Sequence, residues 1–310
     1  DPSLDVAGAA RVSSRRRRLP GIGVRLECTR TLRGCTTVTS RVTLYDGLPW
    51  IDIENAVTKS ATLDKEAVYA AFPFAFTQPT VEMEIPLGRM TVERDQQPGS
   101  CRDWYCQAHW VWLHEGTGGV LWSAPDAPLV TLNDLFRGAW RRTIVPDGTL
   151  FSWVMNNYWH TNYAARQGGA MVFRYRLSLL APGDASEPVR RGWAACEPLY
   201  VGPPYTNATP GPLVARDAAL SIPDRGVAVV GVKPADDGEG AIVKLLEISG
   251  ARRAVGVWPA ACGFQLARRV NLVEMNGAPL TVNADRSAMV DVAPWGIAAA
   301  RLFTPRETAG

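Results

Sequence analysis

The stretch Arg41-Val-Thr-Leu-Tyr-Asp-Gly-Leu-Pro-Trp-Ile-Asp-Ile-Glu-Asn-Ala-Val-Thr-Lys59 decides the fold class of this chain. It contains two segments rich in β-branched and aromatic residues, Val42–Tyr45 and Trp50–Asn55, which favour extended strands. Between them, Asp46-Gly47 supplies the positive φ that a tight hairpin turn needs. The stretch therefore predicts a β-hairpin.

Similar patterns recur along the chain, and no segment sustains the apolar spacing of a long amphipathic helix. Two further hairpins are predicted, Val227–Lys233 with Ile242–Ile248 around Asp237-Gly238, and Val270–Glu274 with Leu280–Val282 around Asn276-Gly277. Residues 181–213 hold seven of the 23 prolines, which predicts an irregular connection there. We therefore expect an all-β protein, with a large β-domain at residues 1–220 and a small β-sandwich at residues 221–310.

Composition excludes several classes of protein. The 310 residues are 46% hydrophobic, enough for a large core, yet no apolar run approaches the roughly 20 residues of a membrane span. The net charge is only +3, and the basic run Arg15–Arg18 stands without interleaved aromatics, so we expect neither a membrane nor a nucleic-acid partner. Six cysteines are too few for a disulfide scaffold and indicate a reducing, cytoplasmic compartment. The first residue is Asp1, which leads us to expect a fragment or a processed product.

One polar and aromatic segment, Trp153 to Leu177, is the best candidate for ligand contact. Amides and hydroxyls can hydrogen-bond a sugar, and aromatic rings can stack on its apolar face. The same residue types also satisfy turn backbones and fill the rim of a β-core. The residues alone favour this structural interpretation.

Several motifs in this region resemble the C-terminal β-domains of bacterial α-mannosidases of glycoside hydrolase family 38. The motifs are Asn156-Asn157-Tyr158-Trp159, Thr161-Asn162-Tyr163, Gln167-Gly168-Gly169 and Phe173-Arg174-Tyr175-Arg176. Segments 41–59 and 65–74 upstream, and 232–238, 245–250 and 271–274 downstream, are similar to the same family in the same order.

This resemblance implies a large super-sandwich of the galactose-mutarotase type followed by a smaller β-sandwich. It implies a retaining zinc enzyme that removes terminal α-linked mannose, with this region packing on an N-terminal catalytic domain and adding side chains to the rim of its site. The candidate sugar-contacting residues are Asn156, Asn157, Trp159, Thr161, Asn162 and Arg166. The implied partners are α-mannoside glycans, the catalytic domain and further copies of the chain in a homo-oligomer.

The catalytic groups of such an enzyme are not expected in this chain. The family holds zinc partly through a His-x-Asp motif, and none of His109, His114 and His160 is followed by Asp at that spacing. Retaining hydrolysis needs two carboxylates about 5–5.5 Å apart. The local pairs Asp52 with Glu54 and Asp236 with Asp237 are more typical of a solvated strand face and a hairpin tip.

We therefore predict no catalytic residue and no metal ligand here, including at Cys101, Cys106 and His109, and an inactive chain when isolated. Zinc is expected in the N-terminal catalytic domain. Two alternatives stay open: a carbohydrate-binding, structural or oligomerisation module without catalysis, and a mutarotase-like enzyme with a His base and a carboxylate facing one pocket.

Overall fold

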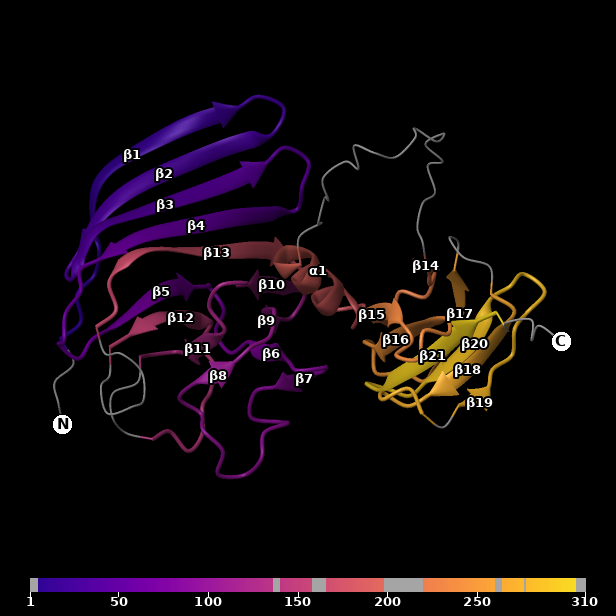
Figure 1. The fold of residues 1–310 in the computed structure, drawn as a ribbon. Helices are drawn as coiled ribbons and strands as arrows, with labels where there is room; N and C mark the ends of the chain where they lie inside the picture. Colours follow the sequence, from indigo (N-terminus) through magenta and orange to yellow (C-terminus); the bar gives the residue numbers. More distant parts are fainter. Residues whose placement is uncertain are drawn as a thin grey trace. The chain divides into compact units, whose positions relative to one another are not determined.

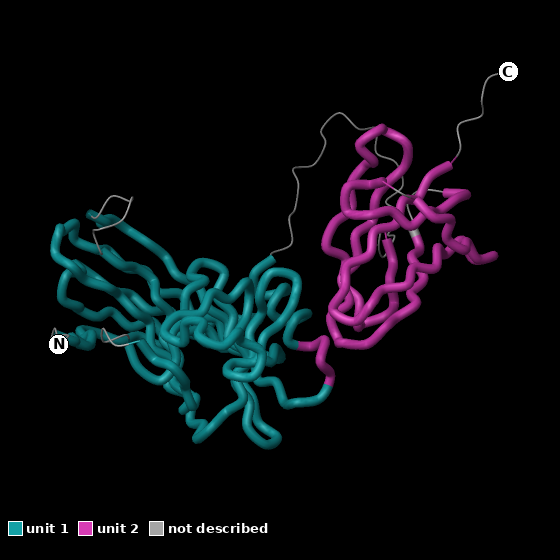
Figure 2. The backbone as a smooth tube through the Cα atoms, turned by 90° about the horizontal axis from the view of Figure 1, so that it is seen from below, with its two compact units in different colours: residues 1–183, 188–198 teal, residues 184–187, 199–310 magenta. Residues whose placement is uncertain are grey.

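The computed structural model describes residues 5–135, 140–157, 166–197, 220–259, 264–275 and 277–304. These residues form two compact units, residues 1–183 with 188–198 and residues 184–187 with 199–310 (Figure 2). Antiparallel strands dominate both units, which confirms the all-β prediction. Residues 198–219 lead up to the predicted boundary near residue 220 and lie outside the described part of the chain, so that boundary stays a prediction.

Unit 1 is a sandwich of a nine-stranded and a four-stranded sheet (Figure 1). The large sheet has the order β1-β2-β3-β4-β13-β10-β9-β6-β7. Its strands are β1 (Ala10–Leu19), β2 (Gly23–Leu32), β3 (Cys35–Tyr45), β4 (Trp50–Lys59), β6 (Thr80–Ile85), β7 (Gly88–Thr91), β9 (Trp110–Glu115), β10 (Gly118–Ser123) and β13 (Gly169–Leu179). The small sheet has the order β5-β12-β11-β8, with β5 (Ala67–Pro73), β8 (Tyr105–Cys106), β11 (Leu129–Leu132) and β12 (Thr149–Asn156).

Large apolar side chains from both sheets meet to form the core of unit 1. Phe72 of β5 packs with Trp122 and Tyr175 of the large sheet, with ring centroids 5.6 and 4.9 Å from its own. All three rings are buried, and burial of this kind of surface is the main driving force for the sandwich. Burial also raises the pKa of Tyr175 to about 12.

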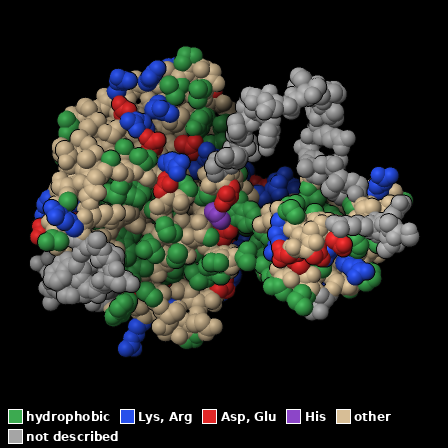
Figure 3. Space-filling view, in the orientation of Figure 1, with side chains coloured by type: hydrophobic (Ala, Val, Ile, Leu, Met, Phe, Trp, Pro, Cys, Tyr) green, Lys and Arg blue, Asp and Glu red, His purple; other side chains and the backbone are tan. Residues whose placement is uncertain are grey.

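The predicted hairpin at residues 42–55 is confirmed, and it belongs to a wing of the large sheet formed by β1–β4. Among the described residues of β1–β3, only Cys35 and Val38 pack against the core. Strand β1 is the edge strand, and nearly all of it is exposed, including the basic run Arg15–Arg18. Figure 3 shows basic and acidic side chains interspersed over this part of unit 1.

One helix, α1 (Glu187–Cys196), lies in the segment for which the sequence predicted only an irregular connection. That prediction was wrong for these ten residues. Asp184 starts the turn by accepting hydrogen bonds from Ser186, and Pro188 falls in the first turn, where its missing N–H does no harm. The prolines that argued against a strand are therefore compatible with a helix start.

Unit 2 is a second, smaller sandwich, as predicted. A three-stranded sheet, β14 (Leu220–Ser221), β17 (Arg253–Pro259) and β20 (Ala288–Val292), packs on a five-stranded sheet. The latter has the order β15-β16-β21-β18-β19, with β15 (Val227–Pro234), β16 (Ala241–Glu247), β18 (Leu266–Val270), β19 (Ala278–Pro279) and β21 (Ile297–Phe303). Val, Leu and Ala side chains from the two sheets form the core between them.

The hairpin predicted at 227–248 is confirmed by the pairing of β15 with β16. The hairpin predicted at 270–282 is displaced, because its first strand ends at Val270 instead of beginning there. Residues 271–275 form a turn in which the Asn271 side chain accepts hydrogen bonds from the N–H groups of Val273 and Met275.

No helix in the described part of the chain is long and apolar enough to span a bilayer.

Candidate functional site

Asn157 holds the chain where it leaves β12, and its side chain is only 1% exposed. The amide nitrogen donates to the backbone oxygens of Thr62 and Asp64 at 2.7 and 2.8 Å, and the backbone N–H donates to Glu66 O. The amide oxygen accepts a long hydrogen bond, 3.4 Å, from the Gln167 N–H. Asn157 thus joins the two ends of the candidate segment to the loop that precedes β5.

That loop, residues 60–66, is fixed at both ends. Lys59, 3% exposed, forms an ion pair with Glu66 and donates to Ser60 O at 2.7 Å. At Gly168, an added Cβ would lie 2.8 Å from the Cβ of Ala61, so only glycine fits there without movement. The segment that follows β12 therefore starts and ends on a firmly held support.

Asn156 has a different environment from its neighbour. In the pairing of β12 with β5, Asn156 lies opposite Ala67 and Trp153 lies opposite Tyr69, with an irregularity in between. Cross-strand partners share a face of the sheet, and Ala67 and Tyr69 are two residues apart, so all four side chains share one face. This face points away from the core, and Asn156 is partly exposed on it.

Five aromatic rings, which we call the aromatic cluster, lie on this outer face of the four-stranded sheet. Trp153 stacks on Tyr69 and on Trp104, with centroid distances of 5.9 and 5.3 Å. Phe151 contacts Tyr69 edge to face, and Trp140 contacts Trp104 in the same way at 6.0 Å. Trp140 is 70% exposed, and the other four are half-buried.

An ion pair between half-buried Arg141 and buried Asp103 holds the two tryptophans that come from loops. Arg141, next to Trp140, donates from Nε to Asp103, next to Trp104, at 3.0 Å. Asp103 is fully buried, and Arg141 also donates to Leu132 O and to the hydroxyl of Thr131. Because a guanidinium held by several hydrogen bonds has few alternative positions, it fixes the backbone that carries both indoles.

The cluster and Asn156 together present stacked rings beside an amide. Aromatic faces bind the apolar C–H face of a pyranose, and an amide can both donate to and accept from its hydroxyls. The arrangement is suited to binding a sugar. It supplies no pair of carboxylates for cleaving one.

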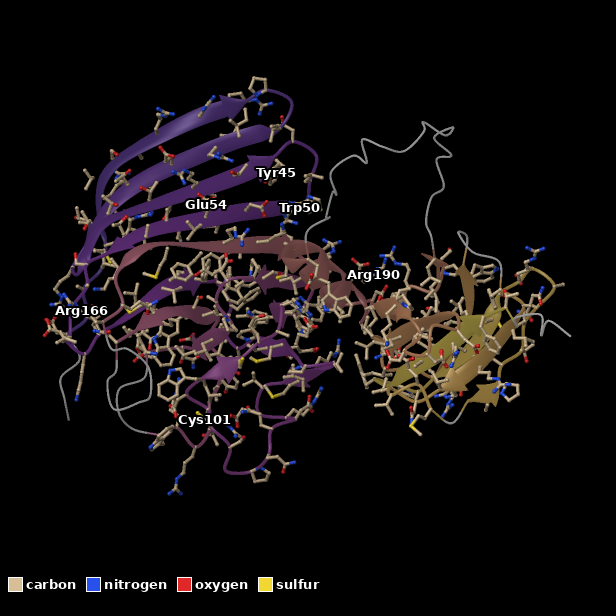
Figure 4. All side chains as sticks on the ribbon, viewed as in Figure 1. Tyr45, Trp50, Glu54, Cys101, Arg166 and Arg190 are labelled. Carbon is tan, nitrogen blue, oxygen red and sulfur yellow. The ribbon has the colours of Figure 1, made fainter. Side chains whose placement is uncertain are left out.

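Arg166 is exposed and lies close to the start of β13 (Figure 4). Trp159, Thr161 and Asn162 lie outside the described residues. Sugar contact by the six candidates stays a prediction. For Asn157, the structure shows an amide already engaged by backbone groups.

The carboxylates considered for catalysis are engaged with arginines. Arg176 donates to Asp52 at 2.6 Å, and Arg41 forms an ion pair with Glu54. Tyr45 also donates to Asp52, and Figure 4 shows Tyr45, Trp50 and Glu54 along strands β3 and β4. These pairs lie on the face of the wing opposite the core-facing residues, as the sequence predicted.

The hairpin-tip acids of unit 2 are likewise paired with cations. Arg301 donates to Asp237 at 2.6 Å, and Lys233 forms an ion pair with Asp236.

Among the described residues, no group of three or more His, Cys, Asp or Glu side chains could hold a metal ion. Cys101 contacts Asp103, whereas the ring Nδ1 of His109 lies 3.0 Å from Glu84. The residues present therefore do not fit a zinc site within the described chain.

Sequence reasoning missed Tyr69, Trp104 and Trp140 as members of this site. Tyr69 stood in a segment of family resemblance, but only the strand pairing shows that it adjoins Trp153. Trp104 and Trp140 come from loops that are far apart in sequence, and no local pattern signals their contact.

The fold of this chain is similar to that of known proteins, whereas comparisons of its sequence found no match. No protein-family model matches the chain, and no curated protein matches it. Solved structures do match, among them an α-mannosidase from Enterococcus faecalis V583, with a TM-score of 0.70 and 15% identity. A glycosyl hydrolase family 38 protein from Enterococcus faecalis matches with a TM-score of 0.69 and 14% identity.

Each match covers 96% of this chain, and the chain spans only 35% and 36% of the two structures. Both units of the chain are therefore included in the match. The similarity confirms, at the level of the fold, the resemblance to family 38 α-mannosidases that the sequence motifs indicate.

Proposed function

We propose that this chain is the C-terminal β-region of a bacterial retaining α-mannosidase of glycoside hydrolase family 38. In this proposal it braces a separate catalytic domain and presents sugar-contacting side chains at the rim of that domain's site. The observation that carries the proposal is the match of the whole two-unit fold to such enzymes, over 96% of the chain and about a third of theirs. The order of the sequence motifs supports it independently.

The proposal divides the chemistry between two parts of the longer protein. Zinc and the nucleophile belong to the catalytic domain, because the described residues here offer no ligand cluster and the candidate carboxylates Asp52 and Glu54 are paired with arginines. The contribution of this chain is to orient the mannoside. Asn156, Trp159, Thr161, Asn162 and Arg166 are the proposed contacts, while Asn157 positions the segment that carries them.

A cytoplasmic location belongs to the same proposal. The described cysteines, Cys28, Cys35, Cys101, Cys106 and Cys196, are free thiols, which suits a reducing compartment.

The test is to translate the gene upstream of Asp1, and to express both the longer product and the 310-residue chain. We expect a barrel domain with a His-x-Asp motif, and hydrolysis of an aryl α-mannoside by the longer product only. Absence of such a domain, or no activity of the longer product with zinc supplied, would count against the proposal.

The aromatic cluster favours a second candidate, a carbohydrate-binding module without catalytic function. An indole that is 70% exposed, on a backbone fixed by the Arg141–Asp103 ion pair, is a suitable sugar-binding surface. Affinity electrophoresis of the isolated chain in gels containing mannan distinguishes the two. Retardation that is lost in Trp140→Ala, without any upstream catalytic domain, would favour the binding module.

A further inference from the structure

Glu84 is a buried carboxylate that joins helix α1 to the large sheet of unit 1. It lies on β6 and is only 4% exposed. Its Oε1 accepts a hydrogen bond of 2.6 Å from the indole N–H of Trp193 in α1, and its Oε2 lies 3.0 Å from Nδ1 of His109. His109 directly precedes β9 and lies edge-on to the Trp193 ring.

The second ring nitrogen of His109 faces the end of the same helix. His109 Nε2 lies 3.5 Å from a carboxylate oxygen of Glu197, the residue that follows α1. The thiol of Cys196 donates to the backbone oxygen of His109 at 3.4 Å. The imidazole therefore lies between one buried and one exposed carboxylate.

A cation near the C-terminal end of α1 stabilises the helix electrostatically. The C-terminal end of a helix carries partial negative charge, and α1 has no basic residue in its last turn. Glu197 adds a further negative charge there. A protonated His109 neutralises this end of the helix, although it comes from a different element.

The middle of α1 is held by packing that does not depend on charge. A Cβ added at Gly192 would lie 2.2 Å from the indole Cδ1 of Trp110, so the helix backbone lies directly on that ring. Pro188 and Val189 are buried as well. A change of charge at His109 therefore acts on the last turn of α1 and leaves the helix in place.

We propose that protonated His109 is a clamp that fixes the C-terminal end of helix α1 to unit 1, and that this end is released as the pH rises. Deprotonation removes the attraction between His109 and Glu197. It also leaves the Glu84 and Glu197 carboxylates facing a neutral ring. The Trp193 hydrogen bond and the weak hydrogen bond from the Cys196 thiol then remain to hold the last turn.

The directions in which the pKa values of His109 and Cys196 are shifted agree with this geometry. The hydrogen bond to Glu84 raises the pKa of His109, burial opposes the increase, and Glu197 adds to it. A raised pKa means that the clamp is complete below the ordinary His pKa and is lost as the pH passes the folded-state value. Burial raises the pKa of the Cys196 thiol to about 12, so this group stays protonated over the same range.

The neighbouring charges on β6, β7 and β9 form a separate set. Glu82 lies 3.5 Å from His114 and 3.2 Å from Arg89. Because Glu82 has the cation Arg89 as a second partner, and because neither of these two contacts involves α1, His114 is a suitable control.

The position of α1 in the chain gives the clamp its significance. Residues 184–187 and the residues from 199 onward belong to unit 2, so unit 2 segments adjoin α1 in sequence on both sides. Release of residues 193–197 lengthens the connecting segment at one of these two points. The inference goes beyond the proposed function and does not depend on it.

Hydrogen exchange on the 310-residue chain tests the clamp. Protection factors of the amides of residues 193–197 should fall by about threefold or more between about pH 5.5 and pH 8.5, in the range expected for a charge at a helix end. In His109→Gln they should be low and independent of pH. In Glu197→Gln the pH dependence should disappear, while His114→Gln should behave like the wild type.

Protection factors that do not change with pH in the wild type would overturn the clamp, and so would a pH dependence that survives in His109→Gln. An NMR titration of the His109 ring gives an independent check. A pKa at or below the ordinary value would overturn it too. Activity towards mannosides enters none of these measurements.

Discussion

The side-chain nitrogen of Asn157 lies 2.7 Å from the backbone oxygen of Thr62, which fixes the end of β12 to the loop that precedes β5. These groups are far apart in sequence, and the Asn157 amide reaches both Thr62 and Asp64. The side chain is therefore a structural bridge beneath the candidate sugar-contacting segment.

Asn157→Ala should lower the free energy of unfolding of unit 1 by about 1–3 kcal/mol, because it removes a buried amide and two hydrogen bonds to the Thr62 and Asp64 carbonyls. Urea unfolding followed by tryptophan fluorescence measures this. Asn156→Ala, on the exposed face, is the matched control and should change stability by about 0.5 kcal/mol or less. Equal effects of the two substitutions would contradict the structural role of Asn157.

If the proposed function is correct, Asn156→Ala and Trp159→Ala in the mannosidase that contains this chain should each reduce catalytic efficiency on an aryl α-mannoside by about tenfold or more, roughly 1.4 kcal/mol of transition-state binding. Their melting temperatures should stay close to the wild type. Asn157 is less informative in this assay, since its loss acts through the fold. Wild-type kinetics in both variants would remove the segment from the site.

The purified 310-residue chain should carry no stoichiometric zinc. The His-x-Asp motif is absent from the sequence, and Cys101 and His109 contact different partners. Elemental analysis after dialysis measures the metal content. About one tightly held zinc per chain would contradict this prediction.

Glu247 should make the stability of unit 2 depend on acid pH. It is fully buried and accepts hydrogen bonds from the N–H groups of Ser249, Gly250 and Trp295 at 2.8 to 3.0 Å. Burial raises its pKa, but these hydrogen bonds outweigh the effect and the pKa lies below its usual value. The stabilisation is present above the ordinary Glu pKa of about 4.3, and is lost as the pH falls through the lowered one.

Glu247→Gln should therefore melt below the wild type at neutral pH, with a destabilisation of about 1–3 kcal/mol. The difference should shrink below about pH 4, where the wild-type carboxylate is protonated as well. Differential scanning calorimetry of both proteins across this range is the measurement, with the exposed Glu239→Gln as control. A constant difference at all pH values would show that charge is not the cause.

The sequence could predict the strands because their pattern is local. Asp46-Gly47 and Asp237-Gly238 mark turns through their own backbone preferences, and both hairpins are present. Helix α1 could not be predicted in the same way, because it is short and its stability comes from contacts such as Gly192 on Trp110. The turn at Asn271 shows the same limit, since its hydrogen bonds shorten the expected strand.

The candidate site could be predicted only in part, for a similar reason. The segment from Trp153 onward has a composition that indicates ligand contact. Which of two adjacent asparagines is buried depends on the register with β5 and on the loop carbonyls, neither of which the sequence reveals. The stacking of Trp104 on Trp153 depends on tertiary contacts between distant segments.

Strand β1 is the exposed edge of the wing, and its arginines affect the tendency of the protein to self-associate at high concentration. An unpaired edge strand is a template on which another molecule can add a strand, and like charges there oppose that addition. Arg18 is paired with Asp46, whereas Arg15, Arg16 and Arg17 lie along an exposed strand. Replacing these three with serine should promote self-association, visible by light scattering, and high salt should do the same to the wild type. We therefore expect the basic run to oppose strand addition at this edge at low salt.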